Sequence, residues 1–404
     1  MSPAQSPIAG LLVELHNHAH LAVLHGHDFT ADAMRMLQWR AHLWGGSVTE
    51  LGPSRFLVTL PPDVAAKPVM PPHDSASRIE RWQVEMAATP LVSDTHDARP
   101  VVTVDPVRYG GLGGIGSGYH YPEQLERSDA SVPTLSAPQF GWRWRMDYER
   151  DMALAVAFGK ALVQERVNLA FQPVVRYDQP QVALYSEGLL RVFGLPGGEG
   201  AGQVTPVLER LGLIRALDRL VVLAVLDQLE RHDEWRLGCN VSACSLVADV
   251  WWASTFDRLA ARPEVAARLT IEITETAPIP DFDIAVAFVE RLKTLGCQIA
   301  LDDFGSGHSS LAFARATRPQ IIKLDAYCLR DARDRDAGLR TFRHLVALCQ
   351  TLATHVVAEG VEQTDDVRIA FEAGVDWLQG VALAPPVPCS PPVTLLDVVP
   401  EADA

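Results

Sequence analysis

Hydrophobic residues recur along this chain with two spacings, about two residues apart in strand-like runs and about 3.6 in helical ones. From about Ile8 to Val107, strand-like runs alternate with segments of helical spacing. The order is close to β-α-β-β-α-β, which predicts a small α+β domain over residues 1–109. Its strands are expected at 11–15, 54–60 and 100–104, and its helices at 29–44 and 75–86.

A different repeat begins after a glycine-rich stretch. Residues 110–147 hold many glycines with scattered proline and serine, a composition typical of a linker. After a helical segment at 148–165, short apolar strands alternate with helical segments about every 30 residues. Eight strands with helices between them predict an α/β fold, a TIM-like (β/α)8 barrel over residues 148–395, with a tail at 396–404. The strands are expected at 169–175, 182–190, 236–242, 268–275, 298–304, 320–325, 355–361 and 376–380.

Charge and composition narrow the range of functions. The 404 residues include 35 basic and 50 acidic ones, a net charge of −15, whereas proteins that grip long nucleic acids are usually basic. The first ten residues lack the basic start of a signal peptide, and no apolar run reaches the ~18 residues of a membrane span. Six cysteines without C-x-x-C spacing argue against a disulfide framework and against a zinc site. We expect a cytoplasmic protein without a membrane span and without a nucleic-acid polymer as its partner.

Polar residues stand near the ends of the predicted barrel strands, where TIM-like barrels carry their active sites. Several carboxylates at one mouth cannot all stay ionised without cations. Oxygen donors without cysteine or histidine favour Mg²⁺ or Mn²⁺, and two adjacent aspartates suit two ions about 3.5–4 Å apart. Each carboxylate taken alone has an alternative role, as a helix cap or a surface ion-pair partner. The candidates are Glu187, Asn240, Glu272, Glu275, Asp302, Asp303, Lys323, Glu359, Glu362 and Gln379.

The segments around these residues resemble the EAL-domain family, which consists of cyclic di-GMP phosphodiesterases. The motifs that carry the resemblance are FQPVV, SEGLLR, NVSA, IEITE, DDFGSGHSSL, IIKLD, VVAEGVE and GVDWLQGVALAP, in that order. It covers about Tyr148 to Pro388 and implies hydrolysis of cyclic di-GMP to linear pGpG, with two metal ions assisting the attack of water. A homodimer formed through the barrel is expected as well.

The resemblance also implies a role for each candidate residue. The family's signature alanine is Gly188 here, which loosens the strand by about 0.5–1 kcal/mol without removing a ligand. A catalytically silent receptor for cyclic di-GMP, or a scaffold, is the alternative function, but silent members are expected to lose metal ligands. Implied roles are metal ligation for Glu187, Asn240, Glu272, Asp302, Asp303 and Glu359; handling of the attacking water for Lys323 and Glu359; bracing of the loop 302–310 for Glu275; and contacts to the substrate or its network for Gln172, Arg191, Glu362 and Gln379.

The first zone resembles a GGDEF domain, the cyclase fold often found ahead of EAL domains. Residues 26–34 are similar to that family's strand–helix segment, but GPSRF at 52–56 replaces its signature. We therefore expect a degenerate domain without cyclase activity, which acts by contacting the barrel, a second protomer or a protein partner.

Two smaller patterns in this half leave alternatives open. The run HNHAH places three histidines on one face of an expected strand, where they form either a metal site or a polar face; they are His16, His18 and His20. The pair Trp142 and Trp144 is expected to dock the linker on the barrel, with ligand stacking as the alternative.

Overall fold

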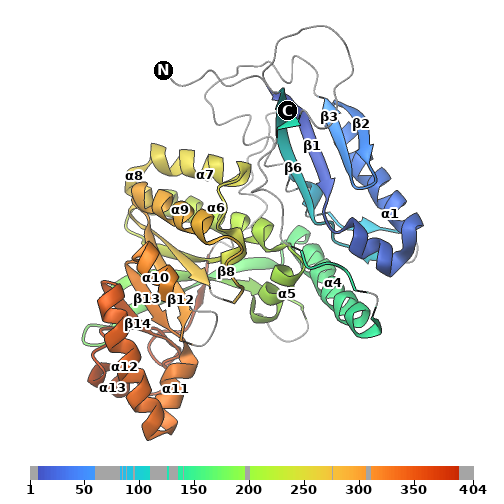
Figure 1. Ribbon diagram of the computed structural model, residues 1–404. Helices are drawn as coiled ribbons and strands as arrows, with labels where there is room; N and C mark the ends of the chain where they lie inside the picture. Colours follow the sequence, from blue (N-terminus) through green and yellow to red (C-terminus); the bar gives the residue numbers. More distant parts are fainter. Residues whose placement is uncertain are drawn as a thin grey trace.

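The computed structural model shows two units that share one long helix (Figure 1). The predicted helix at 75–86 lies largely outside the described residues, as do most of the linker, Glu275 and the tail. The structure describes residues 8–59, 82–83, 85–87, 89–93, 96–109, 125–126, 135–139, 141–195, 201–274, 276–305 and 311–390.

In the described residues, the N-terminal unit is an antiparallel sheet packed against helix α1, with further helical residues at 82–83 and 85–87, in agreement with the predicted α+β class. The sheet has the order β2-β3-β1-β6-β7, with β1 in the centre. Leu11, Val13 and Leu15 of β1 face Leu21 and Leu37 of the helix in one core. The elements are β1 (Ile8–Leu15), α1 (His18–His42), β2 (Ser47–Gly52), β3 (Arg55–Thr59), the short pair β4 (Leu91–Val92) and β5 (Asp97–Ala98), β6 (Val102–Tyr109) and β7 (Leu125–Glu126).

The histidine run does not form a strand face, so that prediction is wrong. β1 ends at Leu15, and α1 begins at His18, ahead of the predicted start of this helix. Asn17 turns the chain, because its side chain donates to Arg99 O and accepts from Val101 N, both at 3.0 Å. Among the described residues, none of the three histidines belongs to a group of side chains that could hold a metal ion.

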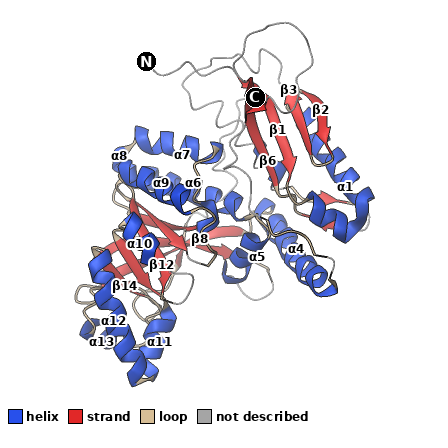
Figure 2. Cartoon of the chain, viewed as in Figure 1, coloured by secondary structure: helices blue, strands red, loops and turns tan. Residues whose placement is uncertain are grey.

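The second unit is a closed barrel, and every predicted strand is present (Figure 2). Strand order follows the chain from β8 to β15, and β15 pairs with β8 to close the barrel. A further strand, β16 (Val387–Pro388), lies beside β8. The barrel strands are β8 (Val167–Arg176), β9 (Ala183–Val192), β10 (Leu237–Ser242), β11 (Leu269–Thr274), β12 (Gln298–Phe304), β13 (Ile321–Leu324), β14 (His355–Ala358) and β15 (Trp377–Leu378).

The barrel departs from a regular (β/α)8 repeat at its first strand. β8 runs antiparallel to both β9 and β15, and a short turn rather than a helix joins β8 to β9. The remaining neighbours from β9 to β15 are parallel. Because of the reversal, Gln172 lies in the middle of β8, directly opposite Glu187 on β9, and not at a carboxyl end.

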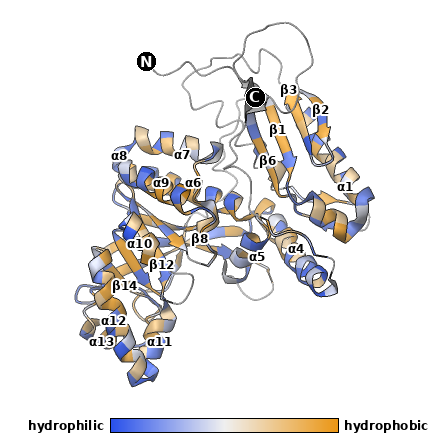
Figure 3. Cartoon of the chain, viewed as in Figure 1, coloured by the Kyte–Doolittle hydropathy of each residue, from blue (hydrophilic) through white to orange (hydrophobic). Residues whose placement is uncertain are grey.

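Helices cover the outside of the barrel, and apolar residues concentrate on the strands that they cover (Figure 3). None of the described helices is both long and apolar enough to cross a membrane. The helices are α4 (Trp142–Val163), α5 (Val204–Arg210), α6 (Ile214–Arg231), α7 (Val250–Ala261), α8 (Pro263–Ala266), α9 (Phe282–Thr294), α10 (Leu311–Thr317), α11 (Ala326–Asp334), α12 (Asp336–Leu352) and α13 (Thr364–Glu372), with short 3₁₀ turns η3 (Ala201–Gln203) and η4 (Ala243–Ser245).

Helix α4 belongs to both units, and the predicted boundary at residue 148 falls inside it. Its first half packs on the N-terminal unit: Tyr148 stacks on His20 with ring centroids 5.3 Å apart, and Trp144 lies 5.9 Å from the same ring. The tryptophan pair therefore does not dock a linker on the barrel; Trp144 contacts the N-terminal unit, and the side chain of Trp142 is 74% exposed.

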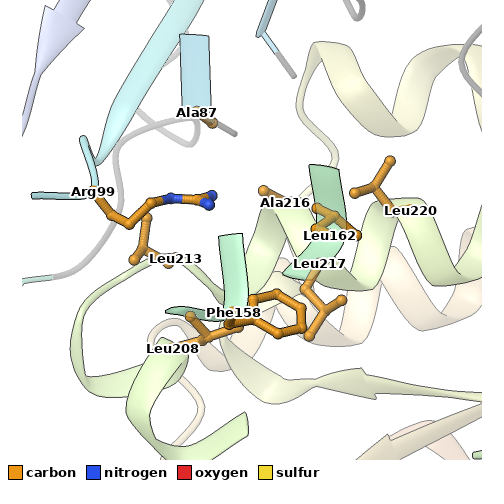
Figure 4. Close-up of a pocket in the computed structure, with 9 residues that line it drawn as sticks. All are labelled: Ala87, Arg99, Phe158, Leu162, Leu208, Leu213, Ala216, Leu217 and Leu220. Carbon is orange, nitrogen blue, oxygen red and sulfur yellow. The ribbon is translucent and has the colours of Figure 1, made fainter. Parts of the chain in front are cut away.

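The second half of α4 closes a small cavity between the two units (Figure 4). The cavity has a volume of about 20 Å³, and the buried guanidinium of Arg99 points into it from the N-terminal unit. Nε and Nη1 of Arg99 have no hydrogen-bond partner within the described structure, and burial lowers the pKa of Arg99 to about 10. Apolar side chains make up the rest of the lining: Ala87, Phe158, Leu162, Leu208, Leu213, Ala216, Leu217 and Leu220.

Candidate functional site

The interior of the barrel has an apolar lower layer and a polar upper layer. The lower layer is a separate core cluster of Val174, Tyr185, Ala300, Ile321 and Val357. Because side chains alternate along a strand, residues two positions away point into the barrel as well. These are two positions further on in the parallel strands and two positions earlier in β8, which runs antiparallel to its neighbours. This periodicity places a polar layer directly above the apolar one: Gln172, Glu187, Asp302, Lys323 and Glu359.

Lys323 lies at the centre of the polar layer and is fully buried. Its Nζ is 2.6 Å from Glu272 Oε2 and 2.6 Å from Glu359 Oε1. The same nitrogen is 3.0 Å from Glu187 Oε2 and 3.1 Å from Asp302 Oδ1. One cation thus faces four carboxylates, so the layer carries an excess of potential negative charge.

Two amides complete the layer around Glu187. Asn240 Nδ2 donates to Glu187 Oε1 at 2.6 Å, and Gln379 Nε2 donates to Oε2 at 2.7 Å. The donors fix this carboxylate, whereas Asn240 Oδ1 and Gln379 Oε1 stay buried without a partner among the described residues. Gln172 is also buried, and its Nε2 donates to Ala384 O at 2.9 Å.

A bulge in β12 brings two consecutive aspartates to the same site. The register between β12 and β13 shifts between Leu301 and Phe304, and Asp303 has a left-handed backbone with φ of 55°. In a regular strand, neighbouring side chains would point to opposite faces. Here a carboxylate oxygen of Asp302, one of Asp303 and one of Glu359 lie within 4.8 Å of one another.

The acids of the polar layer differ in how readily they ionise. Burial opposes ionisation of Glu187, but Lys323 and the amide donors lower the pKa of this carboxyl below its ordinary value. Burial and the charge of Glu187 raise the pKa of Glu272 well above its usual range. Burial and the neighbouring Asp302 raise the pKa of Asp303 to about 7. Burial lowers the pKa of Lys323, but the surrounding carboxylates raise it by more. The net pKa lies well above the ordinary value, so the ammonium stays protonated.

The donor set fits divalent cations. Two groups of three carboxylates have oxygens within 4.8 Å of one another, Glu187–Glu272–Asp302 and Asp302–Asp303–Glu359, and they share Asp302. Asn240 Oδ1 and Glu272 Oε1 are buried without a partner among the described residues, whereas Glu272 Oε2 is paired with Lys323. Orphaned buried oxygens are costly, and a hard cation such as Mg²⁺ or Mn²⁺ would satisfy them.

Other predicted residues lie further from this layer. Arg191 is four residues beyond Glu187 on β9, hence on the same face, and its Nη1 donates to Leu190 O at 3.0 Å. The side chain of Glu362 is 51% exposed, 3.9 Å from Arg333 Nη1. Glu275 and the loop at 306–310 lie outside the described residues, so the proposed brace between them stays a prediction.

The sequence reasoning missed Tyr185 and Gly238, which lie below the polar layer. Both stand two residues before a candidate ligand, Tyr185 before Glu187 and Gly238 before Asn240. Strand periodicity alone indicates that they share its face. Missed too was Glu209 of α5, whose Oε1 accepts from Ser242 Oγ at 2.6 Å and from Thr276 Oγ1 at 2.8 Å. Ser242 is the last residue of the strand that carries Asn240, and Thr276 lies just after the strand that carries Glu272.

Fold and site together define a TIM-like barrel with an acidic centre at the carboxyl ends of its parallel strands. Residues 155–386, more than half of the chain, match the EAL domain family. The chain therefore belongs to that family.

Curated relatives and solved structures agree with this membership. The chain is 30% identical over 238 residues to "Cyclic di-GMP phosphodiesterase PdeR" of Escherichia coli, covering 57% of this chain and 35% of the relative. It is 29% identical to "Cyclic di-GMP phosphodiesterase NbdA" of Pseudomonas aeruginosa over 57% of this chain and 30% of the relative. The match thus spans about a third of each relative's length.

Among solved structures, "PaMucR Phosphodiesterase, c-di-GMP complex" is 27% identical with a TM-score of 0.52, over 59% of this chain and 99% of that chain. An EAL domain protein from Listeria monocytogenes is 25% identical with a TM-score of 0.50, over 57% of this chain and 92% of that chain. Both likenesses concern the barrel half of the chain.

Proposed function

We propose that this chain hydrolyses cyclic di-GMP to linear pGpG with the help of two Mg²⁺ or Mn²⁺ ions. The observation that carries the proposal is the pair of carboxylate triads that share Asp302 inside an EAL-family barrel. Relatives named as cyclic di-GMP phosphodiesterases support the choice of substrate. A shared carboxylate suits two ions that act on one phosphodiester.

The residues of the polar layer would divide the work. Bound ions would polarise the phosphate and make water a nucleophile at neutral pH. Lys323 would remain protonated and offset the negative charge that develops on the phosphate. Glu359 would accept the proton of the attacking water, since its side chain is the most exposed of the four around Lys323, at 16%. One ion would be held by Glu187, Asn240, Glu272 and Asp302, the other by Asp302, Asp303 and Glu359.

Substrate contacts would come from residues around this layer. Arg191, on the face of β9 that carries Glu187, would bind a phosphate of the substrate. Gln172, which is opposite Glu187 across β8 and β9, would lie against a guanine, as the family resemblance implies. Gln379 would support the network through its bond to Glu187, and exposed Glu362 would approach the substrate from outside the layer.

A silent receptor for cyclic di-GMP is the competing function, and the missing signature alanine is the reason to consider it. A β-carbon at Gly188 would face Gly238 O, Phe171 and Val225, at 3.1 to 3.5 Å. Residue 188 therefore points away from the carboxylates, toward α6. Its replacement by glycine leaves every proposed ligand in place, which favours an enzyme.

A turnover assay with metal tests the proposal. Full-length protein is incubated with cyclic di-GMP and either Mg²⁺ or Mn²⁺, and pGpG is quantified by chromatography. We expect turnover that stops with a chelator and falls by roughly a hundredfold or more in Asp302→Asn, which removes the shared ligand. Asp283→Asn, at an exposed carboxylate in the first turn of α9, is the matched control. Tight binding of cyclic di-GMP without pGpG, with either metal, would establish the receptor instead.

A further inference from the structure

Two buried polar side chains under the proposed cation site, Tyr185 and Glu272, each have an oxygen without a partner in the described part of the chain. The Tyr185 side chain is 2% exposed, and its hydroxyl has no hydrogen-bond partner among the described residues. Glu272 is fully buried; its Oε2 lies 2.6 Å from the ammonium of Lys323, whereas its Oε1 has no partner in that part of the chain. A hydroxyl can donate and an ionised carboxylate can only accept, so the two groups are complementary.

Gly238 brings these two groups to the same place. It lies on β10, between β9, which carries Tyr185, and β11, which carries Glu272. A β-carbon at Gly238 would be 2.5 Å from Tyr185 Cε2 and would also overlap Glu272 Oε1. The tyrosine ring and the carboxylate therefore border the same small space, which only glycine leaves open.

Glu187 and Glu272 differ in how they are held. Glu187 receives one amide donor on each oxygen, from Asn240 and from Gln379. Glu272 receives none, although ligands of metal ions are usually oriented by a second hydrogen-bonding group. Tyr185 belongs to the apolar lower layer. The other side chains of that layer are aliphatic, so none of them can accept a hydrogen bond from its hydroxyl.

We propose that Tyr185 is a positioning residue for the cation site: when the site holds its ion, the Tyr185 hydroxyl would donate to Glu272 and leave the other carboxylate oxygen for the ion. Gly238 maintains the space in which they meet. The inference rests on the metal-dependent function proposed above. It assigns Tyr185 no contact with the substrate.

Calorimetric titration of metal-free, full-length protein with Mn²⁺ tests this role without turnover. Tyr185→Phe keeps the ring and removes only the hydroxyl, so we expect Mn²⁺ affinity to fall by roughly ten- to a hundredfold, the usual effect of losing such a partner. Gly238→Ala should weaken Mn²⁺ binding too, because the added methyl displaces Glu272. The matched control is Tyr177→Phe, at a ring that packs on Phe371 at the far end of β8.

Thermal melts distinguish a role of Tyr185 in positioning a metal ligand from a role in core packing alone. Without metal, Tyr185→Phe should melt at or above the wild-type temperature, because an unsatisfied buried hydroxyl is removed. The rise in melting temperature on adding Mn²⁺ should be smaller than for wild type. Wild-type Mn²⁺ affinity in Tyr185→Phe would overturn the inference. If wild type itself neither bound Mn²⁺ nor released pGpG, the proposed function would fail first, a result distinct from failure of the tyrosine alone.

Discussion

At the scale of single residues, the main feature of this barrel is a fully buried lysine among carboxylates. Lys323 Nζ is within 3.1 Å of an oxygen of each of four acids, which raise its pKa against the effect of burial. A buried charge persists only when it is paired in this way. Since the same oxygens would hold the ions, the Lys323 ammonium and the ions would compete for the same carboxylates.

Replacing Lys323 by methionine should separate these two roles. We expect pGpG release to fall by roughly a hundredfold or more, because the positive charge near the phosphate is lost. Mn²⁺ affinity, measured by calorimetry, should be equal or higher, because a competing cation is removed. The control is Lys293→Met on α9, whose Nζ contacts Glu290 Oε1 and Thr317 O. A large loss of Mn²⁺ affinity would instead mean that Lys323 assembles the ligands.

At the scale of elements, helices anchor the strand ends that carry the ligands. One carboxylate oxygen of Asp218 in α6 accepts hydrogen bonds from Ser242 N at 2.9 Å and from Ser245 Oγ at 2.6 Å. These bonds fix the chain from the end of β10, two residues after Asn240, through η4. Burial is the main reason that the pKa of Asp218 is raised, to about 7, and the two hydrogen bonds only partly oppose it. This anchor therefore titrates near neutral pH.

The folded-state pKa of Asp218 exceeds the unfolded value of about 3.9, so the unfolded chain loses this proton first. Stability should fall as pH rises from about 4 to 7 and then stay level with respect to this group. At about 1.4 kcal/mol per pKa unit, the shift corresponds to a few kcal/mol in the free energy of unfolding. Asp218→Asn cannot ionise, and its carbonyl oxygen can accept both bonds. We expect this variant to be more stable than wild type at pH 8 but not at pH 4.5, as measured by urea denaturation; an equal difference at both pH values would contradict the argument.

At the scale of the whole molecule, α4 connects the N-terminal unit to the strand ends of the barrel. Arg99 N donates to Met152 Sδ of α4 at 3.1 Å, and Arg210 Nε of α5 donates to Asp151 Oδ2 at 2.8 Å. Glu209, the residue before Arg210 in α5, accepts from Ser242 at the end of β10 and from Thr276 just after β11. Contacts thus run from the N-terminal unit to the strands of Asn240 and Glu272.

Disturbing the packing on α4 should therefore change turnover. A side chain at Gly159 would overlap the guanidinium of Arg99, so Gly159→Leu should displace Arg99 and disturb the packing between the two units without touching the polar layer. Coupling of about 0.5–2 kcal/mol would change kcat by roughly two- to thirtyfold. A fragment that starts at Gly141, just before α4, should fold, bind cyclic di-GMP and show the same altered kcat.

Adding Arg99→Ala to Gly159→Leu makes room for the new side chain and should restore kcat toward wild type. Steady-state kinetics of the four proteins measure this directly. Wild-type kcat in both the fragment and Gly159→Leu would leave the N-terminal unit without a regulatory role inside the chain.

The sequence by itself determined the eight barrel strands, the family and the candidate ligands. Apolar runs mark buried strands because each must be covered on both faces, and the carboxyl ends of parallel strands must meet at one mouth. The spacing of apolar residues along one strand depends only on that segment, so strands can be predicted before the fold is known.

Only the tertiary structure decided features that depend on pairing between segments. The reversal of β8 places Gln172 opposite Glu187, and the bulge at Asp303 turns two consecutive carboxylates to one side. The turn at Asn17 ends the strand on which the histidines were expected, because its partners are Arg99 and Val101, more than 80 residues away in sequence. Likewise, Tyr185 and Gly238 have no signal as single residues. Gly238 leaves space for Tyr185 and Glu272 only because β9, β10 and β11 are neighbours in the barrel. The sequence does not show which strands are neighbours, so this contact could not be predicted from it.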